Sequence, residues 1–172
     1  MKKVAVIEGG YSKEKAISIK SAKTVFDNLD RTKFEPIRVL IDEKGWTAYD
    51  SEGRYSIDKN DFSFIKNGTK LNFEYAFIVI HGTPGEDGKL QGYLDMIGVP
   101  YNTSSAAIMA LTFQKFHCNQ FLKNFGVNVA EAVLIKSEDV IDERQIIDKV
   151  KLPCFVKPTD GGSSFGVTKV KA

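Results

Sequence analysis

Residues Leu152–Val170, with the sequence LPCFVKPTDGGSSFGVTKV, decide the fold of the second half of this chain. The pattern predicts two short strands, Cys154–Lys157 and Val167–Val170, because valine, phenylalanine and alternating lysine suit half-buried strands. The loop between them is rich in glycine and hydroxyl side chains. Glycine reaches positive φ angles and lets a ligand approach the backbone. Successive amides and hydroxyls in such a loop can form a concave anion-binding surface.

The residues of this loop allow two interpretations. Lys157 stands at the end of the first strand, where it can add a charged contact to a bound phosphate. A glycine-rich hairpin at a solvent-exposed edge is the alternative, because short motifs of this kind also arise by chance. The hydroxyls available to an anion belong to Thr159, Ser163 and Ser164.

The composition is that of an ordinary globular protein, with 42% hydrophobic and 27% charged residues in a chain of 172. Its 24 basic and 22 acidic residues are well mixed, which argues against an electrostatic nucleic-acid binder. No apolar run approaches the roughly 18 residues of a membrane span, and the N-terminal apolar run is too short for a secretion signal. Cys118 and Cys154 have no metal-binding spacing and fit buried thiols of a reducing cytoplasm. We therefore expect a cytoplasmic protein that binds neither nucleic acid nor membrane.

The N-terminal segment predicts a βαβ unit. Lys2–Ile7 is a continuous apolar run typical of a strand buried on both faces, and two glycines end it. Ser12 is placed to cap a helix over Lys13–Leu29, and Glu35–Ile41 predicts a second strand. The helix is expected to bury a face made of Ala16, Ile19, Ala22, Lys23 and Phe26, widened by Ile17 and Val25.

The middle of the chain interrupts the alternation of strands and helices and then resumes it. The stretch WTAYDSEGRYSID, from Trp46 to Asp58, predicts a surface hairpin about an SEG turn. Tyr75–Ile80 predicts a second fully apolar strand, followed by a turn-rich loop in which Asp87 can cap the next helix. Further elements are expected as a short strand at 99–102, helices at 106–111, 113–125 and 141–150, and a strand at 131–136.

Two loops follow the carboxyl ends of the apolar strands, and each carries a candidate functional residue. Glu14 follows the first strand and His81 the second. Ligands of open α/β sheets bind in the crevice outside such strand ends, so Glu14 and His81 face one crevice if both strands are parallel. Each also has a simpler interpretation. A carboxylate in the first turn of a helix is favoured by the helix dipole, and a lone histidine at a strand end most often binds a nearby carbonyl.

Three motifs, in order, resemble those of the D-alanine–D-alanine ligases of the ATP-grasp superfamily. GGYSKEKAIS at residues 9–18 is similar to their first motif, and IVIHGTPGEDGKLQGYLDMIGVPY at 78–101 is similar to their second. FVKPTDGGSSFGVTKV at 155–170 is similar to their phosphate-covering loop. The resemblance spans residues 3–171. The first motif departs from the family pattern at Tyr11 and at Lys15-Ala16.

The resemblance implies an α/β fold with two domains. Residues 1–103 are expected to form a Rossmann-like substrate-binding domain, a parallel sheet with helices on both faces. Residues 104–172 are expected to begin an α+β ATP-grasp domain that binds the nucleotide. The family's C-terminal catalytic and metal-binding domain is expected to be absent, so we expect a truncated piece with no ligase activity by itself.

The resemblance also implies an activity, which is the ATP-dependent joining of two D-alanines through an acylphosphate. The product serves peptidoglycan synthesis and hence the cell wall and cell shape. The implied cofactors are ATP and Mg²⁺ or Mn²⁺, whose ligands lie beyond Ala172, and the implied assembly is a homodimer. Two alternatives stay open: another ATP-grasp ligase with a different acceptor, such as a D-hydroxy acid, and a non-catalytic nucleotide-binding module on the same scaffold.

Residue by residue, the resemblance implies three catalytic residues. Glu14 would pair with the ammonium group of the first D-alanine, and His81 would lie over the carboxylate that becomes phosphorylated. Ser163 would hold Glu14 by a hydrogen bond and touch the substrate. Lys115 and Lys157 would contact the phosphates of ATP. The loop residues implied in nucleotide binding are Gly162, Ser163, Ser164 and Gly166.

Overall fold

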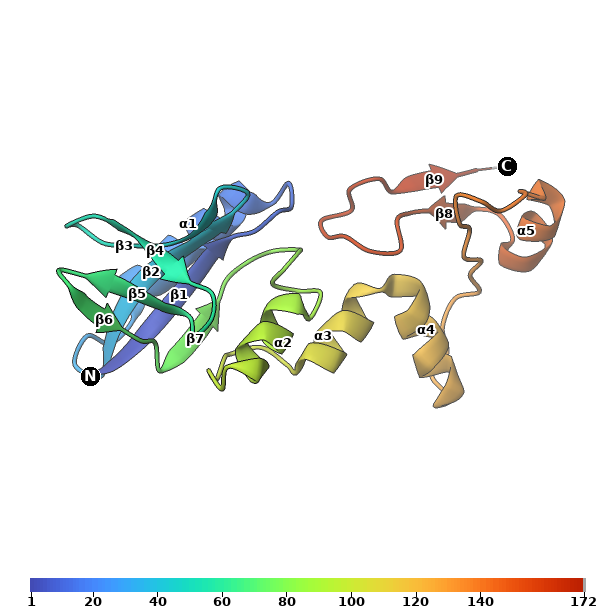
Figure 1. Cartoon of the computed structure of the whole chain (residues 1–172). Helices are drawn as coiled ribbons and strands as arrows, with labels where there is room; N and C mark the ends of the chain where they lie inside the picture. Colours follow the sequence, from blue (N-terminus) through green and yellow to red (C-terminus); the bar gives the residue numbers. More distant parts are fainter. Residues whose placement is uncertain (172) are drawn as a thin grey trace. The chain divides into compact units, whose positions relative to one another are not determined.

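The structure, a computed structural model, describes residues 1–171. The described residues divide into two compact units, 1–110 and 111–171, each with its own secondary structure (Figure 1). No helix within residues 1–171 combines the length and apolar character needed to cross a membrane. The domain ranges expected from the sequence, 1–103 and 104–172, stay predictions.

The first unit is built on a seven-stranded mixed sheet with the strand order β6-β5-β4-β3-β2-β1-β7 (Figure 1). Strand β1 pairs in parallel with both β2 and β7, while the other neighbours pair antiparallel. The strands are β1 (Lys2–Gly9), β2 (Phe34–Asp42), β3 (Gly45–Tyr49), β4 (Arg54–Asp58), β5 (Ser63–Lys66), β6 (Thr69–Leu71) and β7 (Tyr75–Ile78).

The mixed sheet corrects the expectation of a parallel one, which holds only for β2, β1 and β7. The predicted surface hairpin is instead the pair β3 and β4, which extends the sheet beyond β2. Ala48 of β3 and Ile57 of β4 are both buried in the core. Their burial holds the hairpin to the sheet, because apolar side chains removed from water stabilise a fold by roughly 25 cal/mol per Å².

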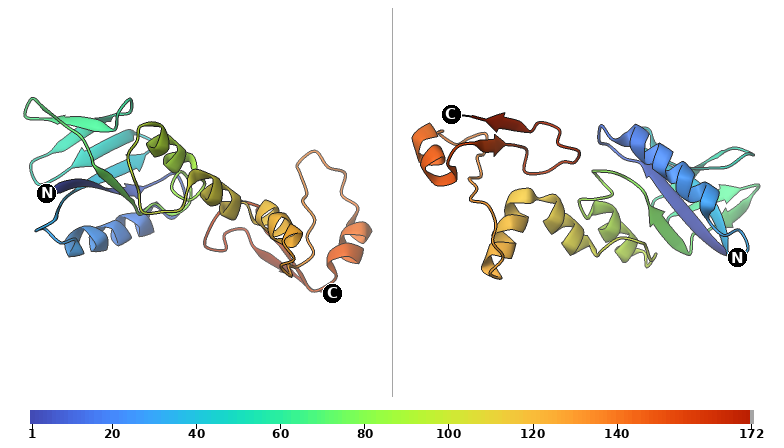
Figure 2. Two further views of the ribbon diagram at one scale, coloured as in Figure 1. Left: turned by 90° about the horizontal axis from the view of Figure 1, so that it is seen from below. Right: turned by 180° about the vertical axis from the view of Figure 1, so that it is seen from behind.

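Two helices cover opposite faces of this sheet, α1 (Lys15–Asn28) on one side and α2 (Lys89–Met96) on the other (Figure 2). The buried face predicted for α1 is partly wrong, since Ala16 and Ile17 are exposed and Ser18 is buried together with Ala22. The Ser18 hydroxyl explains this rotation. It accepts a hydrogen bond from the amide of Gly9 at 2.9 Å and donates one to the carbonyl of Val79 at 2.8 Å.

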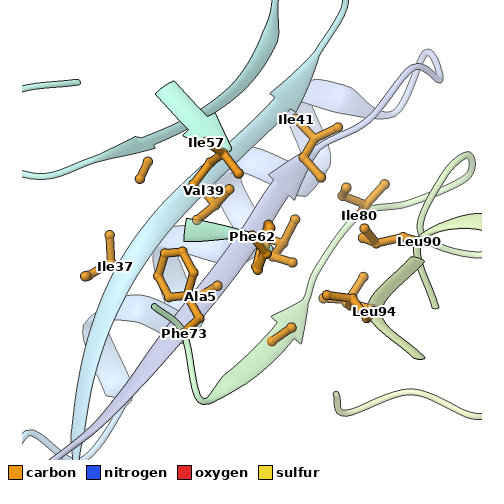
Figure 3. Close-up of a cluster of buried hydrophobic side chains, with 14 of the residues drawn as sticks. Ala5, Ile37, Val39, Ile41, Ile57, Phe62, Phe73, Ile80, Leu90 and Leu94 are labelled. Atoms are coloured by element: carbon orange, nitrogen blue, oxygen red, sulfur yellow. The ribbon is translucent and has the colours of Figure 1, made fainter. Parts of the chain in front are cut away.

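The hydrophobic core lies on the α2 side of the sheet (Figure 3). Alternate residues of the central strands point into it, as the period of two in a strand requires. Phe62, which precedes β5, and Leu90 and Leu94 of α2 close this layer. The strand residues that it buries are Ala5, Ile7, Ile37, Val39, Ile41, Ala76 and Ile78.

After α2 the chain runs through the predicted short strand, which is reduced to a single bridge between Ala76 and Tyr101. Helix α3 (Ala106–Phe113) follows and runs two residues past its predicted end, and α4 (Lys115–Asn124) begins two residues later than predicted. The other elements of the second unit are α5 (Glu143–Val150), β8 (Cys154–Val156) and β9 (Thr168–Val170).

The second unit confirms the predicted hairpin, since β8 and β9 pair antiparallel with Cys154 opposite Val170. The carboxylate of Asp142 caps α5 by accepting from the amides of Arg144 and Gln145 at 3.1 and 3.2 Å. The strand predicted at 131–136 does not form, because no described strand pairs with these residues. A strand without a ladder partner gains no backbone hydrogen bonds.

Candidate substrate and phosphate sites

The loop that follows β1 is tied to its neighbours through the backbone. The amide of Gly10 donates to the carbonyl of Ile41 at 2.8 Å, and the amide of Tyr11 donates to that of Thr83 at 2.9 Å. Gly9 and Gly10 have φ angles of +96° and +93°. A Cβ atom on Gly9 would lie 2.3 Å from the carbonyl oxygen of Ile41. This loop therefore needs its glycines to bring residues 11–14 over the end of the sheet.

Ser12 connects the two candidate residues. Its hydroxyl donates to the carbonyl of His81 at 2.7 Å and accepts from the amide of Glu14 at 3.1 Å. The predicted helix-capping role of Ser12 is therefore corrected. Helix α1 begins at Lys15 with Glu14 in the capping position, where no side chain caps it by a hydrogen bond.

Glu14 and His81 lie on adjacent loops at the carboxyl ends of β1 and β7, which pair in parallel as the crevice argument requires. The side chain of Glu14 is buried, with the residue 6% exposed. A Cβ atom built on Gly82 would lie 3.9 Å from the Glu14 Oε2 atom, so the carboxylate lies beside the residue that follows His81. His81 is half-buried. The structure thus brings together the two candidates of the first unit.

Two residues that the sequence reasoning did not assign hold the His81 loop. The Glu86 carboxylate accepts from the amide of Gly82 at 2.7 Å. Gln91 is fully buried, and its side-chain amide donates to the carbonyl of Gly85 at 2.7 Å and to the hydroxyl of Thr103 at 3.0 Å. The sequence did contain a signal for these two roles: Glu86 is a polar residue inside a turn, and Gln91 is a polar residue on the apolar face of a helix.

Asp87 has a smaller role than the predicted cap. Gly88 takes the capping position of α2, and the carboxylate of Asp87 accepts from the amide of Lys89 at 3.3 Å. Burial favours the neutral carboxyl, but hydrogen bonds from Lys89 and Thr83 outweigh it and hold the pKa of Asp87 below its usual value.

All of the predicted nucleotide-binding residues except Gly166 line one cavity within the second unit. Its volume is about 350 Å³. Lys115 begins α4, its amide donates to the carbonyl of Thr159 at 2.8 Å, and its Nζ donates to the carbonyl of Gly161 at 2.6 Å. The lining residues that were predicted to bind nucleotide are Lys115, Lys157, Gly162, Ser163 and Ser164.

The loop backbone is held in an unusual conformation. Ser163 and Ser164 have φ angles of +50° and +58°, a region that costs residues other than glycine roughly 1–2 kcal/mol each. Gly166, at φ +71°, lies close to Pro158, because a Cβ atom there would be 3.0 Å from the proline ring. The predicted hydrogen bond between Ser163 and Glu14 stays a prediction.

A phosphate group fits the residues of this loop. Lys115 and Lys157 line the cavity together with the hydroxyl-bearing residues Ser163 and Ser164. Successive backbone amides in a turn of this kind can form an anion-binding concavity. By contrast, no three His, Cys, Asp or Glu side chains within residues 1–171 are grouped to hold a metal ion.

Comparison with known proteins gives matches along the chain. A family model described as D-ala D-ala ligase N-terminus matches residues 3–104, and one described as D-ala D-ala ligase C-terminus matches residues 121–172. The D-alanine–D-alanine ligase of Azobacteroides pseudotrichonymphae genomovar. CFP2 is 51% identical over 172 residues, which are 99% of this chain and 53% of that protein.

Solved structures agree with this result. The D-alanine–D-alanine ligase of Coxiella burnetii superposes with a TM-score of 0.86 at 27% identity, covering 100% of this chain and 57% of that one. The Bacillus anthracis ligase complexed with ATP gives a TM-score of 0.74 at 28% identity, covering 100% and 51%. The chain spans about half the length of the curated relatives it matches. Because one family model alone covers more than half of its residues, the chain belongs to the D-alanine–D-alanine ligase family.

Proposed function

We propose that this chain supplies the first-substrate site and the phosphate site of an enzyme that joins two D-alanines with ATP. The reaction would pass through an acylphosphate and serve the synthesis of peptidoglycan precursors for the cell wall. The observation that carries the proposal is the juxtaposition of Glu14 and His81 at the ends of two parallel strands, linked through the hydroxyl of Ser12.

In the first unit, the proposed substrate contacts follow from charge and burial. The Glu14 carboxylate is almost excluded from solvent. An ammonium group brought beside it would form a charge-assisted hydrogen bond, which is about twice as strong as a neutral one. The imidazole of His81 would lie over the D-alanine carboxylate and donate a hydrogen bond close to the transferring phosphoryl group, whose oxygens carry the negative charge of the transition state. The buried Glu14 carboxylate therefore favours the cationic group of a ligand, and His81 favours its anionic group.

In the second unit, Lys115 and Lys157 would neutralise nucleotide phosphates, and the loop at 161–166 would offer backbone amides and the hydroxyls of Ser163 and Ser164. When bound, ATP supplies the phosphoryl group that activates the carboxylate. Mg²⁺ or Mn²⁺ belongs to the proposed reaction, but no residue of this chain is assigned to it. We assign residues 1–103 to the Rossmann-like substrate domain and 104–172 to the ATP-grasp domain.

The proposed setting is the cytoplasm, where both ATP and D-alanine are available, and the proposed assembly is a homodimer. Light scattering on the purified chain, over a tenfold concentration range, measures the assembly. A mass of one chain at every concentration would contradict the dimer.

The experiment that tests the function is calorimetric titration of this chain with D-alanine and, separately, with a non-hydrolysable ATP analogue. We expect both to bind, with D-alanine preferred over L-alanine. Nucleotide binding without any D-alanine binding would favour the non-catalytic nucleotide-binding module. Binding of neither ligand would contradict the proposal.

Product formation is a separate measurement. On mixing the chain with ATP, Mg²⁺ and D-alanine, we expect no D-alanyl-D-alanine, and its detection would contradict the predicted inactivity of the piece.

A further inference from the structure

The β2–β3 turn, taken as residues 41–46 with the strand ends that flank it, contacts the Glu14 loop on both sides of Glu14. Gly10, Tyr11 and Lys15 each make one of these attachments. All of them lie within the first unit. Tyr11 and Lys15 are also positions at which the sequence departs from the family's first motif, so the contacts give both departures a structural role.

Lys15 makes the charged attachment. Its Nζ lies 3.1 Å from Asp42 Oδ2 and 3.2 Å from Glu43 Oε2. The Asp42 side chain is only 12% exposed, and its other oxygen accepts from the amide of Lys44 at 2.9 Å. The hydrogen bond from Lys15 lowers the pKa of Asp42, so the carboxylate stays ionised near neutral pH. The acceptor for Lys15 is therefore fixed within the turn.

Tyr11 makes the aromatic attachment. Its hydroxyl accepts a hydrogen bond from Trp46 Nε1 at 3.3 Å. The Trp46 ring is held in turn by edge-on contacts with Tyr93 and Phe62, at centroid distances of 5.1 and 6.1 Å. Such aromatic pairs contribute beyond their buried area. Tyr11 is 45% exposed. Its hydroxyl is nevertheless bound to the Trp46 ring, which is packed against the core.

The backbone supplies the third attachment. Gly10 donates its amide to the carbonyl of Ile41 at 2.8 Å, and Ile41 pairs with Trp46 in the sheet register. The loop is therefore fixed to the same two strands at positions 10, 11 and 15, which bracket Glu14. A loop attached at both ends has few conformations left to lose on binding a ligand.

We propose that the β2–β3 turn is a positioning device for the Glu14 carboxylate, with Tyr11, Lys15, Asp42 and Trp46 as positioning residues. The inference rests on the proposed function in one respect, the role of Glu14 toward D-alanine. The attachment of the loop to the turn is independent of that role. The device acts by keeping residues 10–15 in the binding-competent conformation before the amino acid arrives.

The test uses the full chain and three variants. Lys15→Met keeps the aliphatic stem and removes the charge, Trp46→Phe keeps a ring and removes the donor, and Tyr11→Phe removes the acceptor. Lys20→Met, at an exposed position of the same helix, is the matched control. Amide hydrogen exchange of Tyr11 and Glu14 is measured by NMR, with amides of β1 as the internal reference, and D-alanine affinity is measured by titration.

We expect each test variant to speed exchange of the loop amides about two- to fivefold and to weaken D-alanine by a similar factor, with β1 and the control unchanged. Unchanged loop exchange in all three variants would overturn the proposal. Faster exchange with undiminished D-alanine affinity would also overturn it, since the turn would then order the loop without serving the site. If the unaltered chain binds no D-alanine, the proposed role of Glu14 fails, and the exchange data alone decide whether the turn holds the loop.

Discussion

The hydroxyl of Ser12 donates a 2.7 Å hydrogen bond to the carbonyl oxygen of His81 and so joins two loops 69 residues apart in the sequence. The same hydroxyl accepts from the amide of Glu14. One oxygen therefore serves both loops, in addition to the backbone hydrogen bond from Tyr11 to Thr83 that also joins them.

Ser12→Ala removes both hydrogen bonds and leaves the His81 carbonyl without this donor. We expect a loss of about 1–3 kcal/mol in the free energy of unfolding, because a part-buried polar group loses its partner. Urea unfolding measures the loss. Ser21→Ala, at a half-buried serine of α1, is the control, and an equal effect in both variants would contradict the special role of Ser12.

Gly82 tests the close approach of the two loops. It has a φ of +76°, and a Cβ atom there would lie 2.8 Å from the Cβ of Ser12. We expect Gly82→Ala to be more destabilising than Gly98→Ala. Gly98 has a similar φ of +72° but nothing within 4 Å of its Cβ position, so the control isolates the backbone cost of about 1 kcal/mol. Thermal unfolding of both variants gives the difference, and equal melting temperatures would contradict the predicted clash.

A buried ion pair joins β1 to β2, and its arginine also donates to the Ile19 carbonyl of α1. Glu8, 1% exposed, accepts hydrogen bonds from Arg38 and from the hydroxyl of Tyr49. Arg38→Met would leave the Glu8 charge buried without its cation, and we expect a cost of about 3–5 kcal/mol in urea unfolding. Arg54→Met is the control, since Arg54 is exposed and stacks on the Tyr49 ring at 5.4 Å without contacting a buried carboxylate among the described residues. A cost below about 1 kcal/mol for Arg38→Met would show that the pair contributes little.

Tyr49 gives this network a pH dependence. Burial and its hydrogen bond to Glu8 raise the pKa of the Tyr49 hydroxyl above its usual value near 10. A raised pKa in the folded state means that its contribution to stability is complete below pH 10 and is lost as the pH rises toward the folded pKa. We expect unfolding free energies to fall above pH 10, and Tyr49→Phe to reduce the steepness of that fall. An identical pH profile in the variant would contradict the assignment.

The phosphate loop is tested by nucleotide binding. Lys115→Ala and Lys157→Ala each remove a positive charge from the cavity, and we expect about tenfold weaker binding of a fluorescent ATP analogue, with a smaller effect at high salt. Lys171→Ala, at an exposed position after β9, is the matched control. Affinity unchanged by either cavity variant would show that nucleotide does not use this loop.

The strands at Lys2–Ile7 and Tyr75–Ile80 could be predicted from the sequence because each is a continuous apolar run. The hairpin that carries the phosphate loop could be predicted as well. The sequence also predicted that Glu14 and His81 would face one crevice if their strands were parallel, and β1 and β7 do pair in parallel. It did not reveal that β3 and β4 join the sheet. A hairpin with alternating polar and apolar residues has the same sequence pattern whether it extends a sheet or stands alone. The buried face of α1 was misjudged because Ser18 is chosen by its hydrogen bonds, which a hydrophobicity pattern does not register.

Residue-resolved NMR titration of this chain with D-alanine tests most directly whether Glu14 and His81 form the substrate site. We predict saturating shifts centred on the amides of Glu14, His81 and Gly82, absent with L-alanine at equal concentration and lost in Glu14→Gln while the rest of the spectrum stays folded. Shifts elsewhere in the chain, or shifts that persist unchanged in Glu14→Gln, would contradict the account.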